Sequence, residues 1–318
     1  MLKRMYLKKI LISSLALFSF FLIYFLPNEK NNITYKEQLE YVDKDIITHD
    51  IYLLDKNNYL AKAEIIIQSE DTEGIAQELI RAMIIGEAME DKIPNGFKAI
   101  IPSNTKVLGM DYNENILKIN FSKELLDTNI DNEEKIIEAI IYTLTSINDV
   151  DKIIIMIEDK VLTKLPQSQI TLPTTLDRSY GINKQYNLST NNNINKTTIY
   201  YINKYNTHEY YVPVTKINND ARDKIEIIID ELSSKNIYTT NLMSYLNDNT
   251  KILSVNEENS VLTIDFNDYI FNDLDTKEIL EEVIYTIYLS VKDNYNVKDV
   301  IFTYNNKEIY KNVSKVLE

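Results

Sequence analysis

Apolar and polar positions along this chain follow two alternating periods, and these periods occur in the same order twice. Residues 50–55 and 60–67 are runs of β-forming side chains joined by a short Lys-Asn-Asn segment, which predicts a β-hairpin. From Thr72 onward apolar residues recur every three or four positions, so we expect an amphipathic helix that ends near Gly86. The first part of the chain is therefore expected to begin with two strands and a helix.

A second hairpin and a second helix are expected to follow. Residues 104–121 contain two β-forming runs around a polar patch, which is typical of a hairpin with a loop of several residues. The helix is expected to begin at Asp131, because Asp131 and Glu134 have the spacing of a capping box. Five consecutive apolar residues within 152–158 predict a central strand. The first unit, residues 46–176, thus has the predicted order β-β-α-β-β-α-β.

The same order of elements returns in residues 196–318. The expected elements are strands at 198–203, 210–216 and 300–304, a helix over 221–232, and a helix that opens with Asp275 and Glu278. Between these helices, residues 249–266 repeat the hairpin of residues 104–121, and Glu138 to Thr143 align with Glu281 to Thr286. Seven of the eighteen hairpin positions are identical. Chance gives roughly one identity in such a window, so we infer an internal duplication.

These patterns predict an α+β fold. Leu117, Ile119 and Phe121 alternate with polar residues, so one face of their strand is apolar and needs a helix to cover it. We therefore expect two tandem units, each with two helices packed on one mainly antiparallel sheet. Residues 177–195, which include Gly181 and a run of three asparagines, are expected to link the two units.

The N-terminal sequence predicts a membrane anchor. Residues 10–26 are uncharged and mostly Ile, Leu and Phe. A helix of that length is about 25 Å long, close to the ~30 Å hydrocarbon layer of a bilayer. The basic residues precede it, so residues 1–27 are expected to form a cytoplasmic basic segment and a transmembrane helix, followed by a polar stalk at 28–45. The apolar run ends without the small residues of a cleavage site, which favours a retained signal anchor over a cleaved signal peptide.

Charge and cysteine content limit the classes of partner. The net charge is −14, and because the first nine residues hold four basic residues and no acid, the remainder carries −18. Phosphate backbones repel such a protein, so we expect no nucleic-acid partner. The absence of cysteine excludes disulfides, zinc–thiolate sites and a lipid-modified cysteine near the N-terminus.

Candidate catalytic and metal-binding residues are few. His49 and His208 occupy different places in the repeat and have no second nitrogen or sulfur ligand near them in the sequence, so we expect neither a zinc site nor a catalytic triad. The equivalent hairpin positions Asn120 and Asp265 carry a carboxylate in the second unit only, and we interpret both as solvated strand residues. Five glycines in the whole chain are too few for nucleotide-binding loops. We therefore predict no catalytic residue, no cofactor, no metal and no enzymatic activity.

Tyrosine is abundant, notably at Tyr200, Tyr201, Tyr210 and Tyr211 of the second unit. Cross-strand packing within a sheet is the favoured interpretation of these four residues. The alternative is that outward-facing tyrosines form a contact surface or a platform for cell-wall sugars.

Three motifs of the first unit resemble the GerMN domain family. They are Ile-Pro-Ser-Asn-Thr-Lys-Val-Leu-Gly at 101–109, Ile-Asn-Phe-Ser-Lys-Glu at 119–124 and Tyr-Thr-Leu-Thr at 142–145. The family motifs typically read IP-x-GT-K-x-L-G, V-D-F-S-x-E and N-T-L-T, in the same order. The resemblance covers about residues 46–312. In the second unit, Ser254 replaces the motif glycine and the Ile-Pro lead is absent.

The resemblance implies a fold similar to the ring-building motif of secretion-system rings. It also implies a sporulation or germination protein of endospore-forming bacteria, held in the mother cell membrane with both domains facing the intermembrane space. Such a protein would be a non-enzymatic component of the envelope complex joining mother cell and forespore. Its partners would be envelope membrane proteins, and the lipid bilayer through residues 10–26. Homo-oligomer formation stays open, and the alternative function is an envelope protein that binds peptidoglycan or modifies it with Asp and Glu side chains.

Overall fold

The structure is a computed structural model that describes residues 47–234 and 241–312. These residues belong to one compact unit. The predicted anchor at 10–26 and the predicted stalk at 28–45 lie outside the described residues. Within the described residues, none of the helices has the length and apolar character needed to cross a bilayer.

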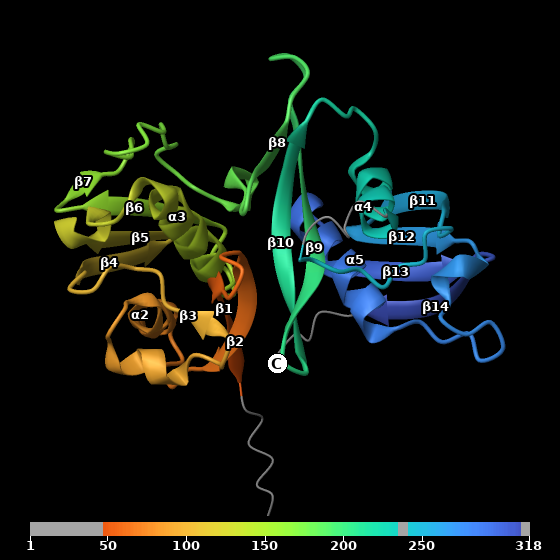
Figure 1. Cartoon of the computed structure of the whole chain (residues 1–318), viewed down its shortest axis with the longest axis horizontal. Helices are drawn as coiled ribbons and strands as arrows, with labels where there is room; N and C mark the ends of the chain where they lie inside the picture. Colours follow the sequence, from red (N-terminus) through yellow and green to blue (C-terminus); the bar gives the residue numbers. More distant parts are fainter. Residues whose placement is uncertain (1–46, 235–240, 313–318) are drawn as a thin grey trace, which may run out of the picture. The chain divides into compact units, whose positions relative to one another are not determined.

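The first repeat contains two sheets and two α-helices (Figure 1). Its elements are β1 (Thr48–Asp55), β2 (Leu60–Ile66), α2 (Thr72–Met83), β3 (Phe97–Lys98), β4 (Val107–Asn113), β5 (Ile116–Phe121), α3 (Ile130–Leu144), β6 (Lys152–Ile157) and β7 (Lys160–Val161), with 3₁₀ helices at Ala88–Lys92 and Lys123–Leu126. The first sheet has the order β2-β1-β3 and is antiparallel. The second has the order β4-β5-β6-β7, in which β5 and β6 are parallel because helix α3 connects them.

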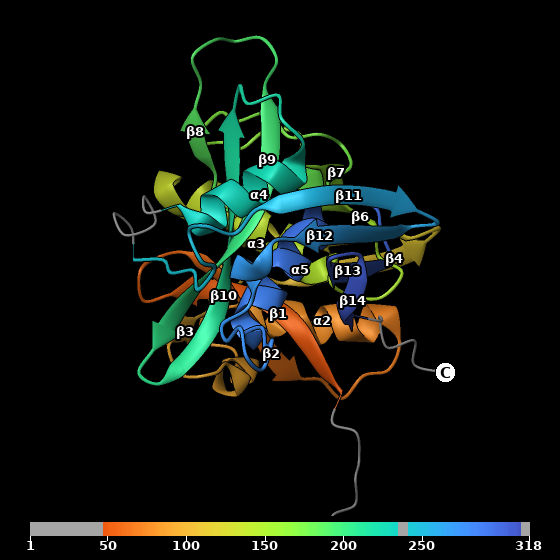
Figure 2. The same cartoon turned by 90° about the vertical axis from the view of Figure 1, so that its right-hand side faces the viewer.

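The second repeat has the same architecture (Figure 2). Its elements are β8 (Gln185–Asn187), β9 (Asn195–Tyr205), β10 (His208–Asn218), α4 (Lys224–Ser233), β11 (Ile252–Glu258), β12 (Val261–Phe266), α5 (Glu281–Asn294), β13 (Asp299–Tyr304) and β14 (Lys307–Asn312), with 3₁₀ helices at Arg178–Tyr180 and Asp268–Ile270. Its sheets have the orders β8-β10-β9 and β11-β12-β13-β14. Strands β12 and β13 are parallel, again because a helix, α5, connects them.

The α+β class and the tandem order are confirmed, but the prediction of one sheet per repeat is wrong. In each repeat a helix side chain takes the place of a strand neighbour at one point along the edge of the first hairpin. The Thr143 hydroxyl of α3 accepts the N–H of Tyr52 in β1 at 2.9 Å. In the same way the Ser290 hydroxyl of α5 accepts the N–H of Tyr200 in β9 at 2.9 Å. At this point the edge of each hairpin donates a hydrogen bond to a helix side chain and not to another strand. The remaining strands form a separate mixed sheet.

Helix α3 begins with a different cap from the one predicted. Its N-cap is Asn129, whose side chain accepts the N–H of Asn132 at 2.9 Å. Asp131 and Glu134, the predicted capping box, lie inside the first turns instead. Asn and Asp cap helices about equally well, so the spacing of the acids was a weaker signal than the preceding asparagine.

Helix α5 begins at Glu281 and not at the predicted Asp275. The Asp273 carboxylate accepts the Asp275 N–H at 2.8 Å, and Lys277 has a φ of 57°, which a helix interior does not allow. Asp273 and Glu278 also form an isolated antiparallel bridge. The acids that suggested a helix start therefore form a tight turn before the helix.

Helices α3 and α5 are equivalent in the two repeats. The residues that correspond in their contacts are, however, not the residues that align in the sequence. Glu138 to Thr143 align with Glu281 to Thr286 at an offset of 143 positions. Thr143 and Ser290, which make the same hydrogen bond to their hairpins, are 147 positions apart. A shift of four residues is close to one turn of 3.6 residues, so both registers bury the same helix face. Apolar periodicity alone could not distinguish them.

Each repeat has its own hydrophobic core. The residues that predicted a covered strand, Leu117, Ile119 and Phe121, are fully buried in the first core. Their counterparts in β12 lie in the second core. Ala61 of the first repeat also packs into the second core, so the two repeats share apolar contacts.

Candidate functional site at the junction of the repeats

The two repeats meet through the hairpins β1–β2 and β9–β10, at residues that are equivalent in the duplication. The Tyr52 and Tyr200 hydroxyls lie 3.0 Å apart. The Asn203 side-chain amide donates to the Asp55 carboxylate at 2.7 Å. Both pairs join residues 148 positions apart, so each residue contacts its own counterpart. Contacts between equivalent residues are characteristic of twofold symmetry, and the junction is therefore a pseudo-symmetric interface within one chain.

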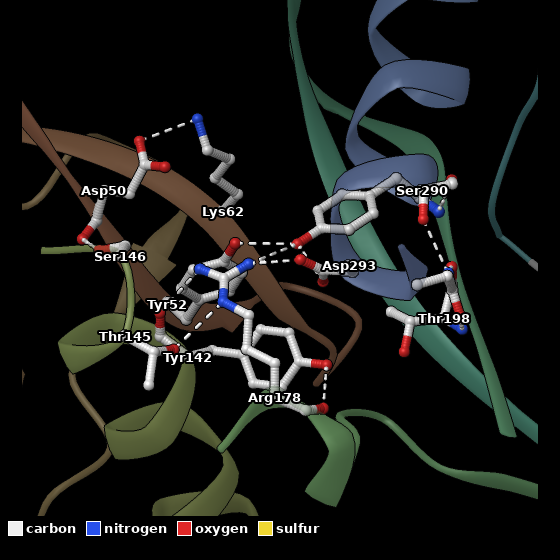
Figure 3. Close-up of polar contacts among 12 residues, drawn as sticks. Asp50, Tyr52, Lys62, Tyr142, Thr145, Ser146, Arg178, Thr198, Ser290 and Asp293 are labelled. Atoms are coloured by element: carbon white, nitrogen blue, oxygen red, sulfur yellow. Dashed lines mark hydrogen bonds and ion pairs between the residues drawn. The ribbon is translucent and has the colours of Figure 1, made fainter. Parts of the chain in front are cut away.

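Arg178 breaks this symmetry and binds both repeats (Figure 3). Its guanidinium donates to the Asp293 carboxylate of α5 at 2.6 Å, to the Thr145 hydroxyl at 3.1 Å and to the Tyr142 carbonyl at 3.3 Å. The guanidinium carbon also lies 5.0 Å from the centre of the Tyr142 ring, within range of a cation–π interaction. The Tyr200 hydroxyl donates to the second Asp293 oxygen at 2.8 Å. One side chain thus connects the end of α3 to helix α5.

The Arg178 guanidinium is held in its charged form beside Asp293. Only 4% of the Asp293 side chain is exposed, and 24% of the Arg178 side chain. Burial lowers the pKa of Arg178, but Asp293 and the surrounding tyrosine hydroxyls outweigh burial and place it well above its ordinary value. Removal of either partner leaves an enclosed charge without compensation, which costs about 3–5 kcal/mol in typical proteins. The pair therefore fixes the two repeats in one orientation.

The segment 177–195, predicted as a linker, makes contacts with both repeats. The Asn183 side chain donates to the carbonyls of Leu60 and Pro213, each at 2.7 Å, and accepts the Leu60 N–H at 2.9 Å. It thereby bridges β2 of the first repeat and β10 of the second. Strand β8, which lies in the same segment, pairs in parallel with the end of β10. The connection between the repeats is therefore part of their interface.

A buried ion cluster joins the same segment to helix α3. Lys184 Nζ lies 2.6 Å from the Glu134 carboxylate and 3.4 Å from that of Glu138. The Glu138 carboxylate also accepts the N–H of Asn183 at 2.9 Å. Burial raises the pKa of Glu138 to about 7, although the Lys184 ammonium acts in the opposite direction. This carboxyl group titrates near neutral pH, and its contacts are to protein groups of the junction.

A groove with a volume of about 1210 Å³ opens between the hairpins of the two repeats and helix α5. Six aromatic side chains line it: Phe97, Tyr205, Tyr210, Tyr211, Tyr285 and Tyr288. Six carboxylates also line it: Asp50, Glu64, Asp151, Glu209, Glu281 and Asp293. The permanent cations number three: Lys62, Arg178 and Lys292. The walls are therefore aromatic and carry an excess of negative charge.

The three cations of the groove all have partners within the protein. Lys62 Nζ lies 2.8 Å from Asp50 and 3.6 Å from Glu64. Arg178 is bound to Asp293 as described, and Lys292 donates to the Val297 carbonyl at 2.6 Å. By contrast, no hydrogen bond or ion pair within the described residues engages the Glu281 carboxylate, which is exposed. An added ligand therefore meets free negative charge in the groove.

The carboxylates that line the groove are its candidates for acid–base chemistry. Acid–base hydrolysis needs one protonated and one free carboxyl group on opposite sides of a substrate bond. Two carboxylates of the groove, Asp50 and Asp293, instead form ion pairs, with Lys62 at 2.8 Å and with Arg178 at 2.6 Å. In the part of the chain that the structure describes, no group of three or more His, Asp or Glu side chains is arranged to hold a metal ion.

The histidines considered from the sequence lie in different surroundings. His49 is half-buried in β1, and burial lowers its pKa although the Asp50 and Glu78 carboxylates act in the opposite direction. His208 is exposed at the start of β10 and lines the groove. Of the two, only His208 is therefore positioned to contact a ligand there.

The equivalent positions Asn120 and Asp265 each hold the turn after the neighbouring strand. Asn120 donates its amide to the Asp159 carboxylate at 2.7 Å and accepts the Asp159 N–H at 3.0 Å. Asp265 accepts the Thr303 hydroxyl at 2.7 Å and the Asn306 N–H at 3.0 Å. The interpretation of Asp265 as a solvated residue is wrong, because it is 6% exposed and fully engaged. Its carboxylate stabilises a hairpin turn.

The four tyrosines singled out in the sequence divide into two groups. Tyr200, Tyr201 and Tyr210 are buried. Two of them contact the first repeat instead of packing only within their own sheet: the Tyr200 hydroxyl lies 3.0 Å from the Tyr52 hydroxyl, and Tyr210 donates to the Asp55 carboxylate at 3.0 Å. Tyr211 is half-buried and lines the groove, with its ring centre 6.0 Å from that of Tyr285. Only Tyr211 is thus available for the alternative role as a contact surface.

Sequence reasoning missed Arg178 and Asn183. Arg178 did carry a signal, because it is one of only four arginines in the chain and lies in a segment expected to be a linker. An arginine has five donors in a fixed arrangement and suits a position between several acceptors. Asn183 carried no signal, since asparagine is common in loops and its bridging role depends on two distant strands.

Comparison with known proteins gives matches over both repeats. The family model described as "Germane: Sporulation and spore germination" matches residues 50–163 and 198–310. The spore germination protein GerM of Bacillus subtilis (strain 168) is 30% identical over 269 residues, which cover 82% of this chain and 72% of that protein. The solved structure of the tandem GerMN domains of the sporulation protein GerM from Bacillus subtilis has a TM-score of 0.73 and 28% identity, and covers 82% of this chain and 92% of that one.

Proposed function

This chain belongs to the Germane family of sporulation and spore germination proteins, and we propose that it acts as a non-enzymatic, protein-binding component of the envelope complex between mother cell and forespore. The sporulation-related role follows from family membership. The resemblance to the GerMN domain, stated from the motifs within residues 101–145, is confirmed by the same comparisons. The protein-binding role is the further step, and it rests on the junction of the repeats.

The groove at the junction is the observation that carries this proposal. Its volume of about 1210 Å³ exceeds the ~300–1,000 Å³ that is usual for sites of small ligands. The Arg178–Asp293 pair and the Asn183 bridge fix the walls on either side of it. A large groove between fixed walls supports recognition of a macromolecule, and the internally paired charges favour binding over chemistry.

We place the protein in the mother cell membrane with both repeats facing the intermembrane space. The support is the sequence of residues 10–26, which has the length and composition of a single transmembrane helix with basic residues before it. Envelope membrane proteins on the same side of that membrane are the proposed partners. A second copy of this chain is included among them, because tandem repeats offer similar surfaces for assembly.

A second candidate function is peptidoglycan binding, and the aromatic walls of the groove favour it. Tyr211 and Tyr285 present two rings with centres 6.0 Å apart, and rings of this kind can pack against the apolar faces of sugars. Titration of the purified chain with muropeptides distinguishes this function from protein binding. Turnover of the muropeptides in the same experiment would instead establish a peptidoglycan-modifying enzyme.

Co-purification from sporulating cells tests the proposed function. The full chain carries a C-terminal affinity tag, and complexes are cross-linked before the membranes are dissolved. We expect envelope membrane proteins to be recovered with it, and not with residues 1–45 fused to an unrelated domain. A deletion strain should form fewer or defective spores. Recovery of the same proteins with the control fusion, together with normal spores in the deletion strain, would refute the proposal.

A further inference from the structure

Two strand edges without a strand neighbour border the groove. Strand β2 is the outer strand of the sheet β2-β1-β3. Strand β10 has β9 on one side, and on the other side it pairs with β8 only at Lys216–Asn218. The first half of β10 therefore has a free edge within the described residues. The groove is lined by Lys62 to Glu64 of β2 and by His208 to Tyr211 of β10, so residues of both edge strands border it.

The Asn183 side chain already occupies one end of the gap between these edges. It accepts the N–H of Leu60 and donates to its carbonyl, as a neighbouring strand would, and it also donates to the carbonyl of Pro213. The groove residues of β2 follow Leu60, and the groove residues of β10 precede Pro213. The groove thus continues along both strands from the point at which Asn183 stops. Backbone groups of an extended peptide can make the same kind of bond farther along.

The walls determine which side chains such a peptide carries. Carboxylates outnumber Lys and Arg in the groove by six to three, and each of the three cations already has a partner. Glu64 on β2 and Glu281 at the start of α5 are both exposed and line the groove. Glu64 shares Lys62 with Asp50. The Tyr211 and Tyr285 rings lie beside Glu281 and offer faces for cation–π contacts. Lysine and arginine side chains therefore match these walls.

We propose that the groove binds an extended segment of a partner protein that contains lysine or arginine, and that this segment pairs with the free edge of β2 or β10 as an added strand. This inference rests on the proposed function, because it specifies how the protein binds a partner. Pairing with the strand edge provides affinity, and the carboxylates and tyrosines select basic side chains. A peptidoglycan fragment can make only the aromatic contacts, because the carboxylates of the groove repel the carboxylates of the fragment.

Defined peptides test the inference on the purified full chain in detergent micelles. The probe is the hexapeptide Lys-Thr-Lys-Thr-Lys-Thr, titrated by calorimetry. We expect saturable binding that weakens as salt is added, because the contact is electrostatic in part. The mirror peptide Glu-Thr-Glu-Thr-Glu-Thr should not bind. A version of the probe with methyl groups on alternate backbone nitrogens should bind at least tenfold more weakly, because it keeps the charge and loses strand pairing.

Two double variants with the same change in charge locate the site. Replacement of both groove acids, Glu64→Gln with Glu281→Gln, should weaken binding of the lysine peptide at least tenfold. The matched control is Glu257→Gln with Glu258→Gln, which removes two charges from the exposed strand β11 outside the groove. It should change the dissociation constant less than twofold. Unfolding curves of both variants establish that each is folded.

Several outcomes overturn the inference. They are the absence of saturable binding, equal binding of the glutamate peptide, an unchanged dissociation constant after N-methylation, and equal losses in the two double variants. Muropeptides that displace the lysine peptide and bind more tightly would assign the groove to glycan. If the peptide fails to bind while envelope proteins still co-purify with the full chain, the groove assignment fails and the proposed function stands. If neither result is obtained, both fail.

Discussion

The buried carboxyl of Glu138 predicts that one part of the stability of this protein falls as the pH rises. Its pKa is raised from 4.5 to about 7 in the folded chain. Between these two values the folded state binds a proton that the unfolded state has released, so stability decreases with rising pH. The difference between 4.5 and about 7 corresponds to roughly 3 kcal/mol, because a tenfold change in proton affinity is worth about 1.4 kcal/mol. The cost is absent below pH 4.5 and complete above pH 7.

The variant Glu138→Gln isolates this effect with little change in contacts. The glutamine oxygen can still accept the N–H of Asn183, which lies 2.9 Å from the Glu138 carboxylate. Lys184 keeps its closer partner, Glu134, at 2.6 Å. We therefore expect the variant to gain up to about 3 kcal/mol of stability at pH 8 and to match the natural chain near pH 4.

Glu133 on the same helix provides a matched control with the opposite sign. Burial raises its pKa, but the N–H groups of Gln167 and Ser168, which donate at 2.9 and 2.7 Å, outweigh burial and lower the pKa overall. A lowered pKa contributes stability that is present above the unfolded value and is lost as the pH falls through the folded value. Glu133→Gln should therefore destabilise the protein at neutral pH, and the difference should shrink in acid.

Urea unfolding between pH 4 and pH 8 measures both variants. The chain has no tryptophan, so tyrosine fluorescence and far-ultraviolet circular dichroism follow the transition. We expect the gain in the free energy of unfolding from Glu138→Gln to grow as the pH rises. The loss from Glu133→Gln should also grow as the pH rises. A difference for Glu138→Gln that is constant with pH, or one with the same sign as the control, would refute the assignment of the raised pKa.

Three other features of the structure lead to measurable changes in stability. Arg178→Met should cost about 3–5 kcal/mol in urea unfolding, because Asp293 is left enclosed without a cation, and adding Asp293→Asn should recover part of the loss. Thr143→Val and Ser290→Ala should each cost about 1–3 kcal/mol, since each leaves a strand N–H of the junction without its acceptor, and similar losses in the two would support the symmetry of the repeats. Asp265→Ala should cost a similar amount, and a neutral result would show that its two donors find water instead.

The hairpins and the duplication could be predicted because their signals are local. The strands predicted at 50–55 and 60–67 agree with β1 and β2, and those at 198–203 and 210–216 agree with the central parts of β9 and β10. Alternating side chains and a short polar turn fix such a pair without reference to the rest of the chain. Within the described residues, local patterning therefore determined most of the strands.

The last strand of each second sheet, β7 and β14, was missed although a signal was present. Asn305 and Asn306 join β13 to β14 and both have positive φ, and Glu158 and Asp159 do the same before β7. Two adjacent asparagines after an apolar strand favour a tight hairpin turn. The separation into two sheets had no such signal, because it depends on where Thr143 meets the backbone of a strand 91 positions away.

The candidate site could not be predicted from the sequence, because its contacts also join residues that are far apart in the chain. The junction is built from pairs such as Tyr52 with Tyr200, which are 148 positions apart, and no periodicity reports a contact over that distance. The duplication made such contacts conceivable, since equivalent residues meet wherever two repeats pack about a twofold axis. The duplication alone could not identify which faces of the two repeats pack against each other. Arg178 lies between the repeats, where no repeat pattern applies.

The asymmetry at the junction bears on the proposal that the protein binds a partner. A symmetric pair of repeats presents two equivalent faces, so a partner could attach in two ways related by the pseudo-twofold axis. In this chain the counterpart of Asp293 is Ser146, whose hydroxyl donates to the Asp50 carbonyl at 3.0 Å and provides no charge for an arginine. Arg178 can therefore form its ion pair with the second repeat only, and this contact makes the two sides of the junction different. If the groove binds a partner as proposed, this difference favours one of the two modes of attachment over the other.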